Sequence, residues 1–502
     1  MTESPDRRWW TLGAVCVATF MLLLDITIVN VALPDISRDL RTSFTDLQWV
    51  IDAYALSLAA LLLTAGSLAD LLGRRLVFAG GLGVFTAASL LCGLAGSPLF
   101  LELARALQGV GAAAMFATSL ALLAATFQGP ERGTAFGAWG ATTGAAVAVG
   151  PLVGGLLTQS VGWQSIFFIN VPIGIGAIAV ALTRVAESRD PDAAGVDWAG
   201  LLTFSGGLFL LVFALVRGNA EGWGSALIVS FLAGAAVLLC AFVVVERRQA
   251  RPMFDLTLLR KPAFAGASIA AFALSASLFS MFLYLTLYIQ NALGYSPLQA
   301  GLRFLPTTLL SFAVAPVAGK LSARLPVRAM IGAGLGLVGL GLLLMSGLDA
   351  DSGWTALLPG FIAAGVGVGL MNPPLASTAV GVVPPARAGM GSGINSTFRQ
   401  VGIATGIAGL GALFQQLLAD KVPGALRRVP TEVLATGNPR VAGPIPAAQH
   451  AYLQAFTGAL DDLFVVAALV AIAGGVLSAV LIRRRDFIAA PGRQPAAAAE
   501  AR

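Results

Sequence analysis

One segment of the chain reads Met21-Leu-Leu-Leu-Asp25-Ile-Thr-Ile-Val-Asn30-Val-Ala-Leu-Pro34. It places a carboxylate deep inside an apolar run that starts near residue 9. At about 1.5 Å of rise per residue, this run is long enough to cross a bilayer core roughly 30 Å thick. An aspartate at such a depth costs on the order of 2.5–3.5 kcal/mol. We therefore expect Asp25 to serve a function that needs a charge or a proton inside the membrane.

The composition of the 502 residues is that of a polytopic membrane protein, because 57% are hydrophobic and 11% are charged, whereas a soluble domain carries about 25% charge. Lys and Arg outnumber the acids by 31 to 25. They gather between apolar runs, which is the positive-inside bias of membrane proteins and predicts no nucleic-acid partner. The three cysteines lack ligand spacing, so we expect no metal site and no cofactor.

An all-α membrane protein with fourteen transmembrane helices is expected from the apolar runs. Basic loops alternate with neutral or mixed loops, which predicts both termini on the cytoplasmic side of the cell membrane. The N-terminal run is too long for a signal-peptide core, so we expect it to remain as an anchor. The predicted spans are 9–33, 47–69, 76–95, 99–126, 133–157, 163–183, 197–216, 224–245, 264–290, 298–318, 328–347, 355–381, 390–418 and 457–482.

Two motifs recur along the chain at nearly one offset. Gly66–Arg75 matches Gly319–Arg328, 253 residues on, and Arg132 matches Arg387, 255 residues on. Two matches in register predict two parallel halves, an arrangement typical of transporters that rock around a site at the interface of the halves. The predicted units are a six-helix bundle at 1–190, two inserted helices at 191–255, a second six-helix bundle at 256–486 and a disordered cytoplasmic tail at 487–502.

The loop between the second and third spans combines an acid with two arginines. We expect Asp70 to cap the N-terminus of a neighbouring helix and to pair with an arginine of the opposite half, which would form a latch that breaks in the other conformation. An ordinary cytoplasmic turn with basic residues is the alternative. The predicted latch residues are Gly66, Asp70, Gly73, Arg74 and Arg75.

Charged residues in the outer half of the first bundle are candidates for proton coupling. Glu102, Arg105 and Gln108 form a stripe on one helix face. Depth arithmetic puts Asp25 roughly 6 Å, Asp52 about 8 Å and Arg105 about 9 Å below the outer edge of the membrane. Burial raises the pKa of a carboxyl and a nearby arginine lowers it, so moving the arginine can load or release a proton. The alternative is an ion pair at the membrane edge.

The fifth span is rich in small residues, which let helix backbones approach closely. A Gly-Pro pair at its centre removes a hydrogen bond and is expected to bend the helix. These residues are Gly140, Gly144, Gly150, Pro151, Gly154 and Gly155.

Polar and aromatic residues at membrane depth are candidates for a substrate cavity. Arg399 lies near the midplane, where a charge is by default a functional residue. Tyr284 and Tyr288 are one helical turn apart, although they fit a core-facing or lipid-facing position equally well. The predicted cavity residues are Asn30, Tyr54, Gln108, Tyr284, Tyr288, Asn395 and Arg399.

Together these motifs resemble the major facilitator superfamily, specifically its fourteen-helix drug:proton antiporters, the QacA/EmrB-like group. The resemblance rests on Asp25–Pro34, the loop Gly66–Arg75, Arg105–Gly109, the glycines from Gly144 to Gly155 and the segment Trp163–Gly174. It implies the superfamily's fold, proton transfer near the Arg105 motif, and antiport through the span-five motif.

We therefore expect a monomeric, proton-coupled antiporter that exports amphipathic drugs or antibiotics by alternating access. With His450 in an outer loop, carboxylates within the membrane are the expected titrating groups. A dedicated exporter of one metabolite, or an uptake symporter, is the first alternative. A membrane enzyme or receptor is the second, although we find no Ser/His/Asp set, ligand cluster or phosphate-binding loop to support catalysis.

Overall fold

The structure, a computed structural model, describes residues 5–41, 44–128, 130–190, 197–249, 252, 254–322 and 324–483. In these ranges the chain forms helices joined by turns and loops, with no strand. Two π-helical segments, η2 (Ser275–Phe279) and η3 (Tyr288–Ala292), flank α11. The α-helices are α1 Pro5–Leu40, α2 Phe44–Leu72, α3 Arg74–Gly93, α4 Pro98–Thr126, α5 Pro130–Ser160, α6 Ser165–Phe168, α7 Asn170–Arg184, α8 Trp198–Glu221, α9 Ala226–Arg248, α10 Pro262–Leu274, α11 Ser280–Leu287, α12 Pro297–Arg303, α13 Leu305–Leu321, α14 Val327–Leu344, α15 Leu358–Gly381, α16 Ala388–Lys421, α17 Thr431–Leu434 and α18 Pro446–Leu481.

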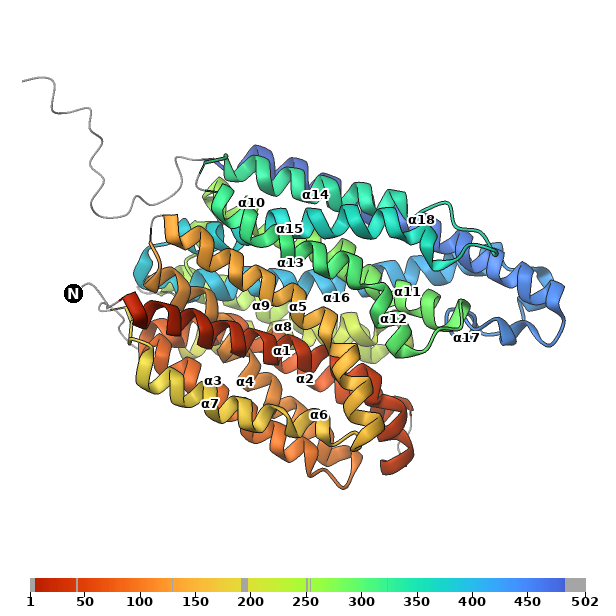
Figure 1. The fold of residues 1–502 in the computed structure, drawn as a ribbon, viewed down its shortest axis with the longest axis horizontal. Coiled ribbons are helices and arrows are strands. Elements are labelled where there is room, and N and C mark those ends of the chain that lie inside the picture. The colour runs from red at the N-terminus through yellow and green to blue at the C-terminus, as the bar shows by residue number, and fades with distance from the viewer. Residues whose placement is uncertain are drawn as a thin grey trace, which may run out of the picture.

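Twelve helical segments in these ranges are long and apolar enough to cross a membrane, and each overlaps a predicted span. The two remaining predicted spans, 133–157 and 298–318, correspond to α5, of 31 residues, and to α12 with α13. α13 is an apolar helix of 17 residues. Neither is among the twelve, so the count of fourteen stays a prediction. α18 and the segment around α17 project beyond the ends of the other helices (Figure 1).

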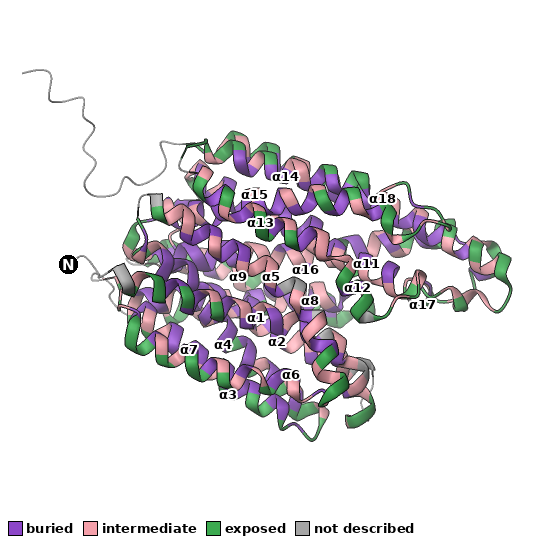
Figure 2. Cartoon of the chain, viewed as in Figure 1, coloured by how far each residue is buried: buried purple, intermediate pink, exposed green. Residues whose placement is uncertain are grey.

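Buried apolar side chains gather in two regions that follow the two parts of the chain related by the sequence repeat. Helices α1–α7 enclose residues such as Phe85 and Trp139, and helices α10–α18 enclose residues such as Phe361 and Phe414. Buried residues line the inner faces of the helices, and exposed residues lie on the outer faces (Figure 2). The two regions meet where α5 packs against α13 and where α2 packs against α16.

Helices α8 and α9 pack against each other beside both regions. α8 contacts α2 through the hydroxyls of Thr64 and Ser205, 2.9 Å apart. It contacts α16 through Asn219, whose Nδ2 donates to the carbonyl of Ala408 at 3.2 Å. α9 is the least buried of the twelve apolar segments. The pair therefore touches both halves through α8, and α9 is the more exposed of the two helices.

Candidate functional site

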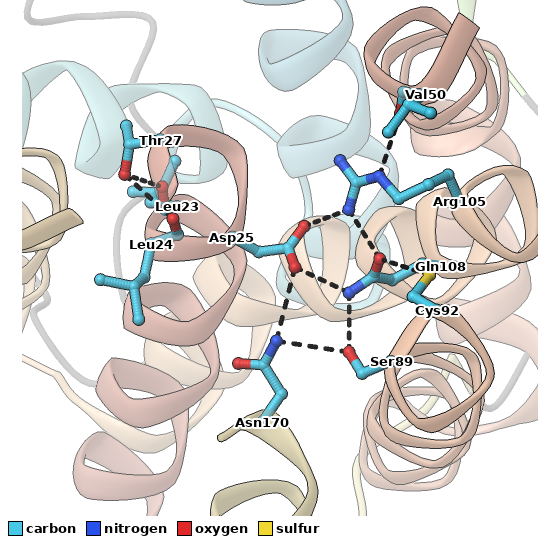
Figure 3. Close-up of polar contacts among 10 residues, drawn as sticks. All are labelled: Leu23, Leu24, Asp25, Thr27, Val50, Ser89, Cys92, Arg105, Gln108 and Asn170. Atoms are coloured by element: carbon cyan, nitrogen blue, oxygen red, sulfur yellow. Dashed lines mark hydrogen bonds and ion pairs between the residues drawn. The ribbon is translucent and has the colours of Figure 1, made fainter. Parts of the chain in front are cut away.

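A buried ion pair joins α1 to α4 at the carboxylate of Asp25 (Figure 3). Arg105 Nη1 donates to Asp25 Oδ2 at 2.5 Å and to Gln108 Oε1 at 2.6 Å, and Arg105 Nε donates to the carbonyl of Val50 at 3.1 Å. Asp25 is 0% exposed and Arg105 is 1% exposed. Because desolvating two ions is expensive, such a pair is tolerated where further hydrogen bonds hold each partner.

Polar side chains from α3, α4 and α7 supply these further bonds. Gln108 Nε2 donates to Asp25 Oδ1 at 2.8 Å and to Ser89 Oγ at 2.7 Å. Asn170 Nδ2 lies 3.4 Å from Asp25 Oδ1 and 3.3 Å from Ser89 Oγ, and donates to both. Four helices thus converge on one carboxylate (Figure 3). We call Asp25, Ser89, Arg105, Gln108 and Asn170 the Asp25 network.

Aromatic rings cover the guanidinium of Arg105. Its central carbon lies 4.3 Å from the ring centroid of Tyr54 and 5.8 Å from that of Phe167, a geometry in which the ring face attracts a cation. The Tyr54 hydroxyl and Asn170 Oδ1 are buried and have no hydrogen-bond partner among the described residues. One unpaired polar group in the network and one beside it can therefore form new bonds when the ion pair changes.

The start of α4 decides which of its polar residues enter the network. Ser97 accepts a hydrogen bond from the backbone N–H three residues on, with proline at the next position, which fixes the first turn. Arg105 and Gln108 are three residues apart and share a buried face. Glu102 belongs to the same predicted stripe, but it is partly exposed and its electrostatic neighbour is Asp46 of α2. The structure separates Glu102 from Asp25.

Asp52 faces the inserted helices, although the sequence predicts it in one layer with Asp25. It interacts electrostatically with Arg217 of α8. Arg217 also pairs with Glu221 at 2.7 Å and lies 5.6 Å from the ring centroid of Trp49. Across the part of the chain that is described, no hydrogen bond or ion pair links Asp52 to the Asp25 network. The orientation of α2 about its own axis points Asp52 toward α8 instead of toward Asp25. Its predicted depth in the membrane is therefore not enough to bring it into the network.

Two members of the network are not among the site residues predicted from sequence. Ser89 and Asn170 are 0% and 1% exposed in the middle of apolar segments. A polar residue at that depth is itself a signal, because the bilayer offers it no hydrogen bonds. Tyr54 and Gln108, predicted for a substrate cavity, instead lie against or within the network and are 2% and 0% exposed.

Polar residues of the second half lie apart from the network. Arg399 Nη2 donates to Asn372 Oδ1 at 2.6 Å, and Asn395 Nδ2 donates to the carbonyl of Ala267 at 3.4 Å. Tyr284 and Tyr288, predicted for the cavity, are 5% and 1% exposed. Their hydroxyls donate to backbone carbonyls at 3.0 and 2.9 Å. Both tyrosines therefore belong to the core of the second half, because their rings are buried there and their hydroxyls have hydrogen-bond partners there.

The predicted latch joins α2 to the N-terminus of α16. Asp70 Oδ1 accepts from the backbone N–H of Gly389 at 2.9 Å, and Oδ2 accepts from that of Met390 at 2.8 Å. The arginine beside Asp70 comes from its own half, because Arg74 donates from Nε to Asp70 Oδ1 at 2.9 Å. Arg74 reaches across as well, with Nη2 donating at 2.7 Å to the carbonyls of residues 385 and 386.

Gly73 and Arg75 belong to the other side of the same turn. Gly73 has a φ of +117°, a left-handed conformation that favours glycine. The backbone N–H of Arg75 donates to Glu187 Oε1 at 2.9 Å, and that of Leu76 donates to Oε2 at 3.2 Å. Glu187 thus caps α3 within the first half.

At both repeated motifs, the backbones of the two halves touch each other at glycines. Gly66 of α2 lies so close to Gly389 of α16 that a Cβ on either would collide with the carbonyl oxygen of the other. Gly133 of α5 and Gly319 of α13 face each other in the same way. The repeated motifs therefore pair crosswise between the halves, and the described part of the chain carries a carboxylate cap only at the first crossing.

The glycines of α5 face two different neighbours. A Cβ at Gly140 would lie 3.3 Å from Pro373 Cγ of α15, and one at Gly144 would lie 3.3 Å from the Thr308 carbonyl of α13. These two glycines form contacts between the halves.

The later glycines of α5 face α1 and α12. A Cβ at Gly150 would collide with Thr27 Oγ1, one at Gly154 would lie 2.8 Å from Ile28 Cγ1, and Gly155 lies beside α12. Thr27 turns away from the network and donates to carbonyls of its own helix (Figure 3). The side chains of two further predicted residues, Asn30 in α1 and Pro151 in α5, lie outside the described residues.

Apolar helices in two packed halves, with a buried charge pair in one of them, define a polytopic membrane transporter. The chain belongs to the Major Facilitator Superfamily, because the model of that family matches residues 15–407. This confirms the family that the motifs resemble. The chain is thus a multi-pass membrane protein of a family that transports small molecules through the lipid bilayer.

Known relatives cover most of the chain. "Multidrug resistance protein Stp" of Mycobacterium tuberculosis is 39% identical over 425 residues, which are 84% of this chain and 79% of the relative. "Tetracenomycin C resistance and export protein" of Streptomyces glaucescens is 35% identical over 449 residues, 88% of this chain and 84% of the relative. The crystal structure of the human organic anion transporter MFSD10 (TETRAN) has a TM-score of 0.59 at 16% identity, covering 93% of this chain and 100% of that one. That likeness concerns the fold alone.

Proposed function

We propose that this chain exports amphipathic drugs or antibiotics across the cytoplasmic membrane in exchange for protons, by alternating access. The observation that carries the proposal is the Asp25–Arg105 pair, fully buried and 2.5 Å apart. A membrane carboxylate held by an arginine can exchange its proton whenever the arginine moves. The names of the relatives, multidrug resistance and tetracenomycin C export, support drugs or antibiotics as cargo.

In this proposal Asp25 takes up and releases the proton, and Arg105 remains charged throughout. A proton entering from outside neutralises Asp25, and Arg105, which cannot lose its own proton, keeps its bonds to Gln108 and the Val50 carbonyl. The weakened pair lets α1 and α4 shift, and the proton leaves toward the cytoplasm. About 2.3 kcal/mol per charge per 100 mV means that roughly 150 mV gives some 3.5 kcal/mol per proton, enough for a gradient near 300-fold of a neutral compound.

The halves that rock in this cycle are the predicted bundles 1–190 and 256–486, with the inserted helices at 191–255 beside them. Both termini, including the tail 487–502, are cytoplasmic, the chain spans the membrane fourteen times, and it works as a monomer. The contacts of α2 with α16 and of α5 with α13 are the ones that such motion has to open or slide, because each joins the two halves directly. Asp70 and Arg74 latch the cytoplasmic end.

A dedicated exporter of one metabolite is the second candidate on the same fold. The name of one relative, "Tetracenomycin C resistance and export protein", mentions a single compound and favours it. Susceptibility testing of a host that expresses the chain against chemically varied antibiotics separates the two candidates. Protection against several unrelated compounds supports broad export, and protection against one class supports the dedicated exporter.

The variant Asp25→Asn tests proton coupling. It removes the titrating group while keeping an amide that Arg105 and Gln108 can still contact, so we expect membrane insertion to persist and export driven by an imposed pH gradient to be lost. The matched control is Glu102→Gln, which removes a carboxylate from α4 outside the network and should leave export near the wild-type rate. Export by Asp25→Asn that remains proton-dependent at the wild-type rate would refute the coupling role.

A further inference from the structure

A second arginine lies at membrane depth, in the other half of the protein. Arg399 is eleven residues after Ala388, the first residue of α16, so it lies about 16 Å along an axis that crosses a core roughly 30 Å thick. The proposed proton exchange does not use it. A charge at this depth is costly and is kept where it has a function.

The contacts of Arg399 leave most of its guanidinium available. Nη2 donates to Asn372 Oδ1 at 2.6 Å, and Asn372 itself is 4% exposed. A guanidinium carries five N–H donors. Among the residues that the structure describes, no carboxylate lies within 4.0 Å of Arg399. The residue is also partly exposed, whereas Arg105 is buried.

Acidic residues are scarce in the helices around Arg399. No Asp or Glu occurs between Asp255 and Asp349, or between Asp351 and Asp420. Helices α10 to α16 therefore hold a single acidic residue, Asp420, in the last turn of α16. At about 1.5 Å per residue, Asp420 lies some 30 Å from Arg399 along that helix.

Arg105 is an internal comparison for Arg399. Its charge is matched by Asp25 and its other donors bind Gln108 and Val50, in a site that leaves the side chain 1% exposed. The chain thus supplies a carboxylate to one membrane arginine and a neutral amide to the other. No described carboxylate of the chain is paired with Arg399.

The position of Arg399 is suited to a ligand that passes between the halves. Its partner Asn372 precedes Pro373, which contacts α5 of the first half at Gly140. Asn372 also fixes one end of the guanidinium, and the rest keeps the planar fork that binds a carboxylate through two parallel hydrogen bonds.

We propose that Arg399, oriented by Asn372, binds the negatively charged group of the transported compound, so that the chain exports organic anions such as carboxylates in preference to organic cations. This inference rests on the proposed export function and names the charge class of its substrate. In this role Arg399 selects the cargo, while Asp25 and Arg105 handle the proton.

Transport of two dyes with one ring system and opposite charge tests the proposal. The full-length protein in liposomes, under an imposed pH gradient, is given carboxyfluorescein, an anionic xanthene, or rhodamine 6G, a cationic one. For Arg399→Gln we expect carboxyfluorescein transport below saturation to fall about tenfold or more, the loss expected for one charge-assisted pair, while rhodamine 6G transport changes by less than about twofold. Arg399→Lys should retain part of the anion transport, and the control Gln400→Ala, a partly exposed neutral neighbour, should retain all of it.

The other possible outcomes of the dye experiment contradict either this inference or the proposed export function. Equal loss of both dyes in Arg399→Gln means a structural role for the arginine and overturns the inference. A wild type that carries rhodamine 6G but no carboxyfluorescein overturns it while leaving export intact. A wild type that carries neither dye contradicts the proposed broad export itself.

Discussion

Replacing Asp70 by asparagine should weaken the contact between α2 and α16. The carboxylate accepts hydrogen bonds from the first backbone N–H groups of α16, at Gly389 and Met390, over 2.9 and 2.8 Å. It also lies 2.8 Å from Arg74, which reaches carbonyls of the other half. An asparagine has one acceptor oxygen and no charge, so it can keep one of the two bonds across the contact and only as a neutral bond.

The size of the effect follows from these bonds. A hydrogen bond to a charged group contributes about 1.5–3 kcal/mol and a neutral one about 0.5–1.5 kcal/mol. Losing one charged bond and weakening the other, with water replacing part of the loss, removes about 2–3 kcal/mol from the closed state at this end. That energy corresponds to a shift of about 30- to 150-fold in the equilibrium between the halves together and the halves apart.

Distances between spin labels at Leu72 and Leu325 measure this equilibrium. Both leucines are exposed, at 51% and 45%, and they lie on different halves at the latch end. We expect Asp70→Asn to convert a short-distance population into a long-distance one. The matched control is Glu187→Gln, which weakens the cap of α3 inside one half. An unchanged distance distribution in Asp70→Asn, or an equal shift in the control, refutes the reasoning.

Two further substitutions address the packing of α5 and the hydroxyl in the Asp25 network. Gly150→Ala puts a methyl group against the side chain of Thr27, so it should lower the thermal unfolding temperature and the export rate, and Thr27→Ala should restore part of both; no rescue would mean that the contact is not the cause. Ser89→Ala takes the acceptor from Gln108 and Asn170, at a cost of about 1–3 kcal/mol for buried donors left unpaired; an unfolding temperature equal to that of the wild type would contradict this.

Residue type and depth along the chain predict the meeting of Asp25 and Arg105, because two opposite charges in one layer of a membrane protein have few other partners. The cap by Asp70 is predictable for a similar reason, since an acid beside a helix end has a clear use. The identity of the arginine that pairs with Asp70 cannot be predicted in this way. Arg74 and an arginine of the other half both fit the pattern of an acid beside a basic residue.

Rotation about each helix axis is what the sequence leaves open. Depth places Asp52 in the layer of Asp25, and the helix-face pattern places Glu102 beside Arg105. Packing nevertheless turns Asp52 toward Arg217 and leaves Glu102 partly exposed. The contributions of Ser89 and Asn170 depend on the same rotation in α3 and α7. Periodicity defines which residues share a face, whereas the partner of that face depends on how all the helices pack together.

The crosswise glycine contacts bear on how fast the halves can separate. At Gly66 with Gly389, and at Gly133 with Gly319, peptide groups touch without interlocking side chains. Such surfaces come apart without any rotamer change, so the barrier to parting lies in hydrating the carbonyls that become exposed. The Asp70 carboxylate caps the crossing at Gly66 and Gly389, and no cap is described at Gly133 and Gly319. The capped crossing is therefore the slower one to separate.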